Sequence, residues 1–479
     1  MMAVAPVQLL FLGRVTAMKE LHVSPHTLEF WVDGILYLFN PLSGALDSMQ
    51  DVSKQEEWKR LRDRKTGSHE LVEELSSRGY IYNDEQEEAA LRARLQDLAE
   101  REASRAVRCH VILTYECNLR CVYCYEDGIS RERGVIKDSR LTAMFAAVDQ
   151  LSASGAEKTQ VVLFGGEPLL NRSSQMRAVH RVLQYGAERG WELEVVTNGV
   201  DLTRYIPLLK ECRVSQVQVT IDGPQNVHDH RRPRTSGRGS FAAIVRSVGE
   251  ALRAELPVAV RVNVDYQNLH HAPHIADLFR AQGWFDQPSF GAYWGLTFDV
   301  NGRHQYCGLP HKILEKILDI RKHHPLTKRI SLEAWEPLQF LLYPFFLGEP
   351  RMPKFFFCGA HRNEWCFDLR GDVYYCADSV GRPEFRVGRY IPCLQLDEEV
   401  SRLWRQHDSL EAPGCASCRA KLCCGGGCWF RRIAAVGSPV GDCCTEHVLP
   451  MLRVAMEYLH RTPELFEFAK NGRYRREEP

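Results

Sequence analysis

The feature that most constrains this chain is the number and grouping of its cysteines. The chain has 17 cysteines among 479 residues. Most of them lie in three groups, within residues 117–124, 358–376 and 415–444. Clustered thiols in a large chain are typical of metal or iron–sulfur ligands when the compartment is reducing. The sequence therefore predicts inorganic centres, held partly by residues far apart in the chain.

Composition and hydropathy indicate a reducing, cytoplasmic location. The 61 Lys and Arg residues balance 61 Asp and Glu residues, so no bulk attraction to nucleic acid or to an anionic membrane is indicated. No apolar run approaches the roughly 18 residues that span a bilayer. The first thirteen residues are mostly apolar, but no Lys or Arg precedes them, so we expect no signal peptide. In the cytoplasm disulfides are disfavoured, which strengthens the ligand interpretation.

Residue patterns divide the chain into four parts. Residues 1–105 contain short apolar runs, a helical pattern at His69–Ser77 and a charged helical stretch, which predicts a winged-helix-like module and a connector. In residues 106–310, β-rich runs alternate with helical stretches, which predicts an α/β fold with a parallel sheet. Residues 311–354 form a bridge. Residues 355–479 are rich in cysteine and glycine and end in a helical segment at Val448–Leu459.

The unusual motifs follow the predicted strands. Strands are expected at residues 110–114, 160–164, 193–197, 214–221 and 258–264, with helices such as 140–151 and 176–189 between them. The segments Cys117–Cys124, Gly165–Pro168 and Thr197–Gly199 come directly after the first three strands. Catalytic residues of such folds gather in loops beyond the carboxyl ends of the strands.

Cys117, Cys121 and Cys124 form the most specific motif. Three thiolates in one short loop can hold three irons of a 4Fe–4S cube and leave the fourth iron open to a small molecule. A structural zinc site is the alternative, but such sites prefer paired cysteines and four protein ligands. A ferredoxin-type cluster would add a fourth cysteine nearby.

This loop resembles the defining C-x₃-C-x-aromatic-C loop of the radical S-adenosylmethionine (SAM) superfamily, with Tyr123 as the aromatic residue. The resemblance implies a partial (β/α)6 barrel that cleaves SAM reductively to a 5′-deoxyadenosyl radical. Two later segments, TNG at 197–199 and IDGP at 221–224, resemble the superfamily's strand-end motifs. By resemblance, the residues that bind SAM include Gly165, Gly166, Glu167, Pro168, Asn198 and Asp222. Glu167 offers a carboxylate suited to the ammonium group of the methionine moiety.

The C-terminal cysteines resemble the SPASM extension of radical SAM enzymes, which binds two auxiliary 4Fe–4S clusters. By resemblance, the first cluster would be bound by Cys358, Cys376 and Cys428. Cys366 either completes that set or leaves one iron open to a substrate thiolate. The second would be bound by Cys415, Cys418, Cys424 and one of Cys443 or Cys444. Zinc ribbons also use C-x₂-C units and remain an alternative.

The remaining cysteines and the histidine-rich stretch are less specific. Cys423 adjoins Cys424, and only Cys424 keeps both spacings. We expect Cys109, Cys212 and Cys393 to be small buried residues, while Cys307 is undecided. The stretch with His228, Asp229, His230 and Arg232 is expected to be structural or near the substrate.

SPASM enzymes mostly modify peptides or proteins, and the N-terminal module resembles the leader-recognition domain of ribosomal peptide maturases. The expected function is therefore a peptide cross-link, preferably a thioether, as in the maturases that include the quinohemoprotein amine dehydrogenase type. A carbon–carbon link and epimerisation are the less preferred products. The expected partners are a leader-bearing peptide and an electron donor of the flavodoxin or ferredoxin type. Sulfatase maturation to formylglycine is an alternative, although Ala377 stands where those enzymes carry an aspartate and Asp378 follows it. An iron–sulfur electron-transfer or zinc scaffold is the non-enzymatic alternative.

Overall fold

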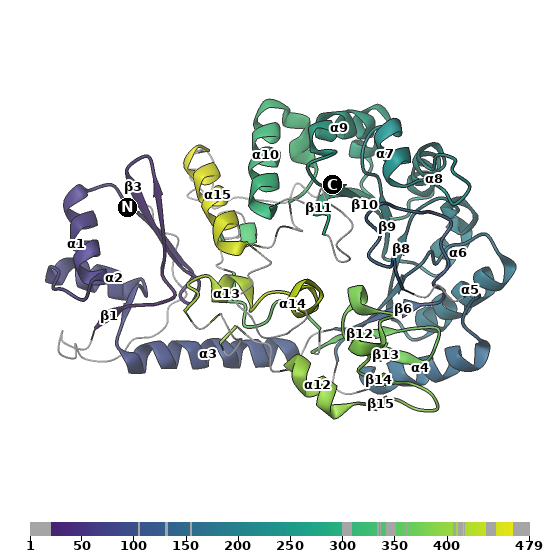
Figure 1. Ribbon diagram of the computed structural model, residues 1–479, viewed down its shortest axis with the longest axis horizontal. Helices are drawn as coiled ribbons and strands as arrows, with labels where there is room; N and C mark the ends of the chain where they lie inside the picture. Colours follow the sequence, from purple (N-terminus) through teal and green to yellow (C-terminus); the bar gives the residue numbers. More distant parts are fainter. Residues whose placement is uncertain are drawn as a thin grey trace.

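The computed structural model describes residues 21–462 apart from several short gaps. The gaps are residues 104–105, 130–132, 154–155, 299–308, 333–334, 336, 342–350, 361, 406–408, 411–414, 416 and 437–446. Cys307, Cys443, Cys444 and the apolar N-terminal residues therefore lie outside the described residues. The chain passes from a small N-terminal module through a long helix into a large α/β sheet, and a C-terminal segment then returns between the two (Figure 1).

Six parallel strands in sequential order form the main body of the fold. Across the sheet they are β11 (Phe290–Leu296), β10 (Val258–Val264), β9 (Gln216–Thr220), β8 (Glu192–Thr197), β7 (Thr159–Phe164) and β6 (Val107–Ile112). Their valine-rich centres are buried, as parallel strands covered on both faces require. The α/β class and the parallel sheet predicted from the sequence are confirmed. The last strand, β11, was not predicted, because its Gly- and aromatic-rich sequence lacks a clear β pattern.

Helices follow the strands and cover the outer face of this sheet (Figure 1). They are α4 (Asp138–Ser152), α5 (Ser173–Glu188), α6 (Ile206–Glu211), α7 (Gln225–Arg231), α8 (Phe241–Arg253) and α9 (Ala272–Ala281). In α5 the buried residues Val179, Val182 and Leu183 recur at helical spacing and face the sheet. The helices expected near 140–151 and 176–189 are thus confirmed as α4 and α5.

The C-terminal segment extends the same sheet. Strand β12 (Glu364–Phe367) pairs in parallel with β6, with Cys366 opposite His110. Strands β13 (Asp372–Tyr374), β14 (Gly388–Arg389) and β15 (Gln395–Leu396) continue outward in antiparallel order. The sequence did not predict that these strands extend the main sheet, because a strand of four residues is too short for its residue pattern to identify a distant pairing partner.

The N-terminal module is built on a three-stranded antiparallel sheet. Its strands are β2 (Leu28–Val32), β3 (Ile35–Asn40) and β4 (Ala45–Met49), followed by α1 (Val52–Arg62) and α2 (His69–Ser77). Strand β1 (His22–Val23) pairs with β5 (Ile81–Tyr82), and the connector is α3 (Asp84–Ala103). The helices and the short strand predicted for this part are confirmed.

Both faces of the module's sheet are buried. Leu36 and Leu38 pack with Trp58 of α1 on one face. Phe30 and Phe39 belong instead to the main core of the protein, which also includes the helix α15 (Val448–His460). The module therefore shares its core with the C-terminal segment.

Polar contacts and a small apolar cluster hold the same interface. Tyr37 Oη lies 2.8 Å from His460 Nδ1, and His460 Nε2 lies 3.2 Å from Asp33 Oδ2. Leu42 and Tyr82 of the module form an apolar cluster with Leu422 of the C-terminal segment. The remaining helices are α10 (Pro310–His323), α12 (Glu398–Arg405), α13 (Lys421–Cys424) and α14 (Trp429–Val436). Among the helices of the described ranges, none combines the length and apolarity needed to span a bilayer.

Candidate active site

The cysteine loop lies beyond the carboxyl end of β6 and is held by a distant segment. Arg120 N donates to Pro233 O at 2.8 Å, and Val122 N donates to Arg231 O at 3.0 Å. Thr235 N in turn donates to Asn118 O at 2.9 Å. The segment 231–239 thus runs alongside the loop and fixes its backbone.

The three thiols of the loop are near enough to influence one another. Burial raises the pKa of Cys117 to about 12, and Glu167, Cys121 and Cys124 add to that effect electrostatically. Three sulfurs on one loop form a donor set that fits an iron–sulfur cluster. In the part of the chain that the structure describes, no three His, Cys, Asp or Glu side chains surround a single ion position. A cube does not need such a group, since each of the three cysteines would bind a different iron.

The glycine turn after β7 packs directly against this loop. Gly166 has a φ of +52°, and a Cβ there would lie 2.6 Å from Glu116 O and from Thr114 O. Its N–H donates to both carboxylate oxygens of Glu126, each at 2.9 Å. Only glycine fits this close approach, which brings the second strand end against the start of the cysteine loop. Glu126, buried directly after the motif, was not singled out from the sequence.

Glu167 links the second strand end to the third. Its Oε1 accepts hydrogen bonds from Thr197 Oγ1 at 2.6 Å and Leu169 N at 2.8 Å, and its Oε2 accepts one from Asn198 N at 2.6 Å. Burial raises the pKa of this carboxyl to about 7, although the hydrogen bonds oppose the shift. Both oxygens therefore have protein donors, and the side chain ties two turns together.

Asn198 joins the third strand end to the cysteine loop. Its Nδ2 donates to Asn118 Oδ1 at 2.7 Å and lies 3.7 Å from Cys117 Sγ. Its Oδ1 accepts a hydrogen bond from Val200 N at 2.9 Å, which orients the amide. The TNG segment thus touches the first cysteine.

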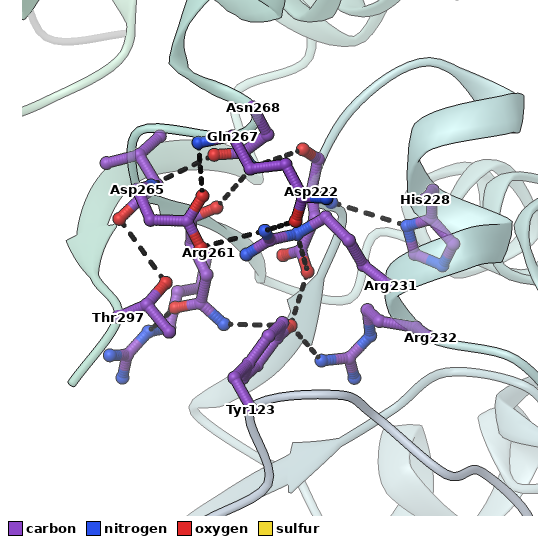
Figure 2. Close-up of polar contacts among 12 residues, drawn as sticks. Tyr123, Asp222, His228, Arg231, Arg232, Arg261, Asp265, Gln267, Asn268 and Thr297 are labelled. Carbon is purple, nitrogen blue, oxygen red and sulfur yellow. Dashed lines mark hydrogen bonds and ion pairs between the residues drawn. The ribbon is translucent and has the colours of Figure 1, made fainter. Parts of the chain in front are cut away.

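The fourth strand end is held by a buried ionic network (Figure 2). Asp222 is fully buried, and its Oδ2 accepts hydrogen bonds from Tyr123 Oη and, at 3.3 Å, from Arg231 Nε. Arg231 NH1 donates to Asp265 Oδ2 at 2.8 Å, and Arg232 NH1 donates to Tyr123 Oη at 2.7 Å. Two guanidinium groups thus face two carboxylates around the aromatic residue of the loop.

The sequence did not predict Asp265 or the roles of the two arginines. Arg231 and Asp265 are almost entirely buried, so each charge depends on the other for compensation. Nearby, His228 Nδ1 accepts a hydrogen bond from Asp222 N at 3.3 Å, and Asp229 Oδ1 accepts from Ser240 N at 2.7 Å. The histidine-rich stretch therefore supports the backbone, which agrees with the expectation of a structural role.

Three C-terminal cysteines meet in one cavity. Cys358, Cys376 and Cys428 line it together with aromatic side chains, among them Trp404 and Trp429, whose rings are 4.4 Å apart. Cys366 is not among the described residues that line the cavity, since it sits fully buried in β12, although it is within electrostatic reach of Cys376.

Steric constraints explain the glycines between Cys424 and Cys428. Gly425, Gly426 and Gly427 all have positive φ, and a Cβ on Gly425 would lie 2.3 Å from the carbonyl of Phe356. The segment therefore wraps closely around the residues that precede Cys358. A second cavity of about 210 Å³ contains Cys358 and Cys424 together, so the two expected cysteine sets are neighbours.

Of the second expected set, the structure describes Cys415, Cys418 and Cys424. Cys418 N donates to Cys415 O at 3.0 Å, so these two cysteines occupy one turn. Of the other thiols, Cys109 and Cys212 are buried as expected, whereas Cys393 is exposed, contrary to expectation. Its exposure follows from its place in the loop between β14 and β15.

Comparisons with known proteins agree with this geometry. Residues 111–279 match the sequence profile of the radical SAM superfamily. The chain is 29% identical over 180 residues to Fe-coproporphyrin III synthase of Methanosarcina barkeri, which is 36% of this chain and 40% of that protein. It is 22% identical over 229 residues to the sporulation killing factor maturation protein SkfB of Bacillus subtilis, which is 48% of this chain and 52% of that protein. The chain thus spans about half the length, or less, of these curated relatives.

Solved structures extend the similarity beyond the matched domain. Native anSMEcpe with bound AdoMet and Kp18Cys peptide has a TM-score of 0.58 at 18% identity, covering 76% of this chain and 99% of that one. Streptococcus suis SuiB bound to the precursor peptide SuiA has a TM-score of 0.53 at 13% identity, covering 89% and 99%. At these identities the likeness establishes a shared fold.

Proposed function

Residues 111–279 of this chain are a radical SAM domain, and on this premise we propose that the protein modifies a peptide or small protein by radical chemistry, preferably forming a thioether cross-link. The superfamily implies a 4Fe–4S cluster and SAM. The observation that supports the site most directly is the meeting of three strand ends on one cysteine loop, through Gly166, Glu167 and Asn198.

We assign the loop cysteines Cys117, Cys121 and Cys124 to three irons of the cluster. That assignment would leave the fourth iron without a protein ligand and open to the methionine end of SAM. When bound, the cluster and SAM would supply reductive cleavage to a radical able to remove a hydrogen atom from the substrate. The chain's own part is to hold the loop, to orient SAM and to exclude water.

The strand-end residues divide this work. The carbonyls of the turn at Gly165–Pro168 are proposed to receive the ammonium group of SAM. Glu167 and Asn198 are proposed to hold this turn against the loop. Glu167, in the turn, accepts a hydrogen bond from Asn198 N, and the side-chain amide of Asn198 reaches Cys117 of the loop. Asp222 positions Tyr123 through the buried network, so its proposed contribution to SAM binding is indirect.

For the C-terminal segment we propose two auxiliary clusters. Cys358, Cys376 and Cys428 are assigned to the first, because they line one cavity. Cys366, buried in β12, is the proposed fourth ligand of this cluster. If Cys366 does not bind, one iron would be open to a substrate thiolate. The second cluster takes Cys415, Cys418, Cys424 and one of Cys443 or Cys444.

The N-terminal module offers a place for an extended leader. A groove of about 500 Å³ runs beside β4, an edge strand of the module's sheet, and reaches Glu74 of α2 and Arg78 at the end of that helix. Edge strands carry unpaired backbone groups that bind peptides by strand addition. Charged residues of both signs line the groove, including Asp51 and Lys54, and are suited to selecting a leader sequence.

Formylglycine formation is the second candidate, and one observation favours it. Asp378 lies two residues after Cys376 and interacts electrostatically with that thiol, one of the three assigned to the first auxiliary cluster. A carboxylate there is suited to accept a proton from a substrate cysteine or serine.

One set of measurements separates these functions. Anaerobically reconstituted protein should carry about twelve irons if three cubes form. Reduction in the presence of SAM should release 5′-deoxyadenosine, which a zinc or electron-transfer scaffold does not do. With a cysteine-containing candidate peptide, loss of two hydrogens and of one alkylatable thiol supports the thioether. A new aldehyde on the peptide would instead support formylglycine formation, and absence of 5′-deoxyadenosine would refute both.

A further inference from the structure

The parallel sheet has an inner face, opposite the face that the helices cover (Figure 1). Along β10, buried valines alternate with Arg261 and Asn263, so these two side chains point to the inner face. Asn263 Nδ2 donates to Tyr123 Oη at 3.2 Å, which brings this face against the aromatic residue of the cysteine loop. A substrate held near that loop would therefore meet the side chains of the inner face.

Arg261 has room on this face because β11 carries no side chain beside it. Its Nε donates to Asn263 Oδ1 at 2.7 Å. Gly295 of β11 is in register with Asn263, and a Cβ on Gly295 would lie 2.6 Å from Arg261 Nε. Gly295 has no positive φ, so its backbone conformation does not require glycine. A glycine within a strand often marks the close approach of another group, and here that group is the guanidinium of Arg261.

The carboxylates on and beside the inner face already have cationic partners. Glu194 of β8 is within electrostatic reach of Tyr293 of β11, but it pairs with Arg108 at 2.8 Å. Both aspartates of the buried network pair with Arg231. Figure 2 shows the guanidinium of Arg261 apart from these aspartates. The charges of these acidic groups are therefore compensated by other arginines.

Arg261 itself has neutral partners in the part of the chain that the structure describes. Besides Asn263, it interacts with Tyr293, which is opposite it on β11. No Asp or Glu side chain of the described ranges forms an ion pair with it. Tyr293 Oη donates to Gln218 Oε1, which holds this hydroxyl on the same face. Because a half-buried guanidinium offers a planar fork of donors that matches a carboxylate, this place is suited to an anionic ligand.

We propose that Arg261, with Tyr293 and Gly295, forms a subsite that binds a carboxylate side chain, Asp or Glu, of the peptide substrate. This inference rests on the proposed function, which supplies the peptide. Arg261 is the fourth of the seven residues of β10, so the subsite lies deeper along the strand than Asn263, which contacts the cysteine loop. SAM also has a carboxylate, but the motifs proposed to bind SAM follow the strands and do not lie within them. The role of Arg261 is to position the substrate.

The test measures how strongly the anaerobic, SAM-loaded holoenzyme binds two neutral-capped dipeptides, N-acetyl-Ala-Asp-amide and N-acetyl-Ala-Asn-amide. The two probes have nearly the same size, and the side chain of the first is its only carboxylate. In ligand-observed NMR titrations, the wild type should prefer the acidic probe by about tenfold or more. Arg261→Gln should reduce this preference to within about twofold, and Arg261→Lys, which keeps the charge but not the fork, should retain part of it. The affinity for SAM should stay unchanged in both variants.

A second variant moves the guanidinium and leaves its charge. Gly295→Ala places a Cβ against Arg261 Nε and should lower the preference to a value between those of the wild type and Arg261→Gln. Gly291→Ala is the matched control on the same strand and face, since a Cβ there meets nothing within 4 Å, and it should keep the full preference. This pair keeps the test decisive if Arg261→Gln does not fold.

Three results would overturn the subsite. They are equal binding of the two probes by the wild type, an unchanged preference in both Arg261→Gln and Gly295→Ala, and a loss of SAM affinity in Arg261→Gln that would assign the guanidinium to SAM. Failure of the wild type to assemble a cluster or to release 5′-deoxyadenosine would instead refute the proposed function.

Discussion

The two cysteine regions of this protein are organised in opposite ways. Cys117, Cys121 and Cys124 come from one loop, and the rest of the fold braces that loop through its backbone and Tyr123. The C-terminal cavity instead takes Cys358, Cys376 and Cys428 from three separate segments. A local motif carries its own geometry, whereas a dispersed one exists only when the surrounding chain is folded. Substitutions in the two regions should therefore fail in different ways.

The sharpest test of this contrast is Cys121→Ala. Removing one of three ligands from the loop should abolish SAM cleavage, by about a thousandfold or more, and lower the iron content by about four while the auxiliary irons remain. The assay is 5′-deoxyadenosine release with parallel iron analysis. Cys212→Ala, a buried thiol of the same domain, is the control and should keep its cleavage activity. Retained cleavage in the loop variant would contradict the ligand assignment.

The reciprocal change is Cys424→Ala. It should abolish peptide product while leaving SAM cleavage without product within about tenfold of the wild type, because the loop does not depend on this segment for its backbone contacts. Product is measured by mass spectrometry beside 5′-deoxyadenosine. The exposed Cys393→Ala is the matched control. If Cys424→Ala and Cys121→Ala lost cleavage equally, the two regions would not be separable.

The bracing of the loop can be broken without touching a cysteine. Arg231→Met leaves Asp222 and Asp265 buried without their shared cation, which typically costs about 3–5 kcal/mol. We expect a lower unfolding temperature for the barrel and loss of the loop's iron before the auxiliary iron. Exposed Arg280→Gln should change stability by less than about 0.5 kcal/mol. An unaltered unfolding temperature in Arg231→Met would show that the network does not support the loop.

The smallest expected effect tests the glycine run of the C-terminal segment. Gly425→Ala places a Cβ against the carbonyl of Phe356 at a positive φ, a strain of about 1–3 kcal/mol. Partial loss of auxiliary iron with full occupancy of the loop is the expected result. Gly291→Ala is the control, since a Cβ there meets nothing within 4 Å. Equal iron contents in the two variants would argue against the close wrapping of this segment.

Sequence reasoning reached the parts of the site that are local. The strands β7, β8 and β10 and the helices α2, α4 and α5 have clear hydrophobic periods, and each motif directly follows its strand. The glycine turn was predicted as a turn, and Glu167 as a site residue. The bonds that Glu167 makes to Thr197 and Asn198 were not foreseen, because sequence order does not say which two turns meet.

Long-range pairings stayed out of reach for the same reason. Nothing in the chain links Arg231 to Asp265, or Glu126 to Gly166, until the strands are side by side. Likewise, β12 is too short for its sequence to predict that it pairs with β6.

By itself, the sequence determined that three thiols share one loop and that polar and glycine-rich segments end the strands behind it. Spacing and periodicity are local properties of the chain, so they can be recognised before the fold is known. The sequence also grouped Cys358, Cys376 and Cys428 by resemblance, and they do share a cavity. Only the tertiary structure decided that Cys366 lies within the sheet, and that the N-terminal sheet buries its second face against α15. Those outcomes depend on which distant surfaces bury most apolar area together, and that choice is made by the whole chain at once.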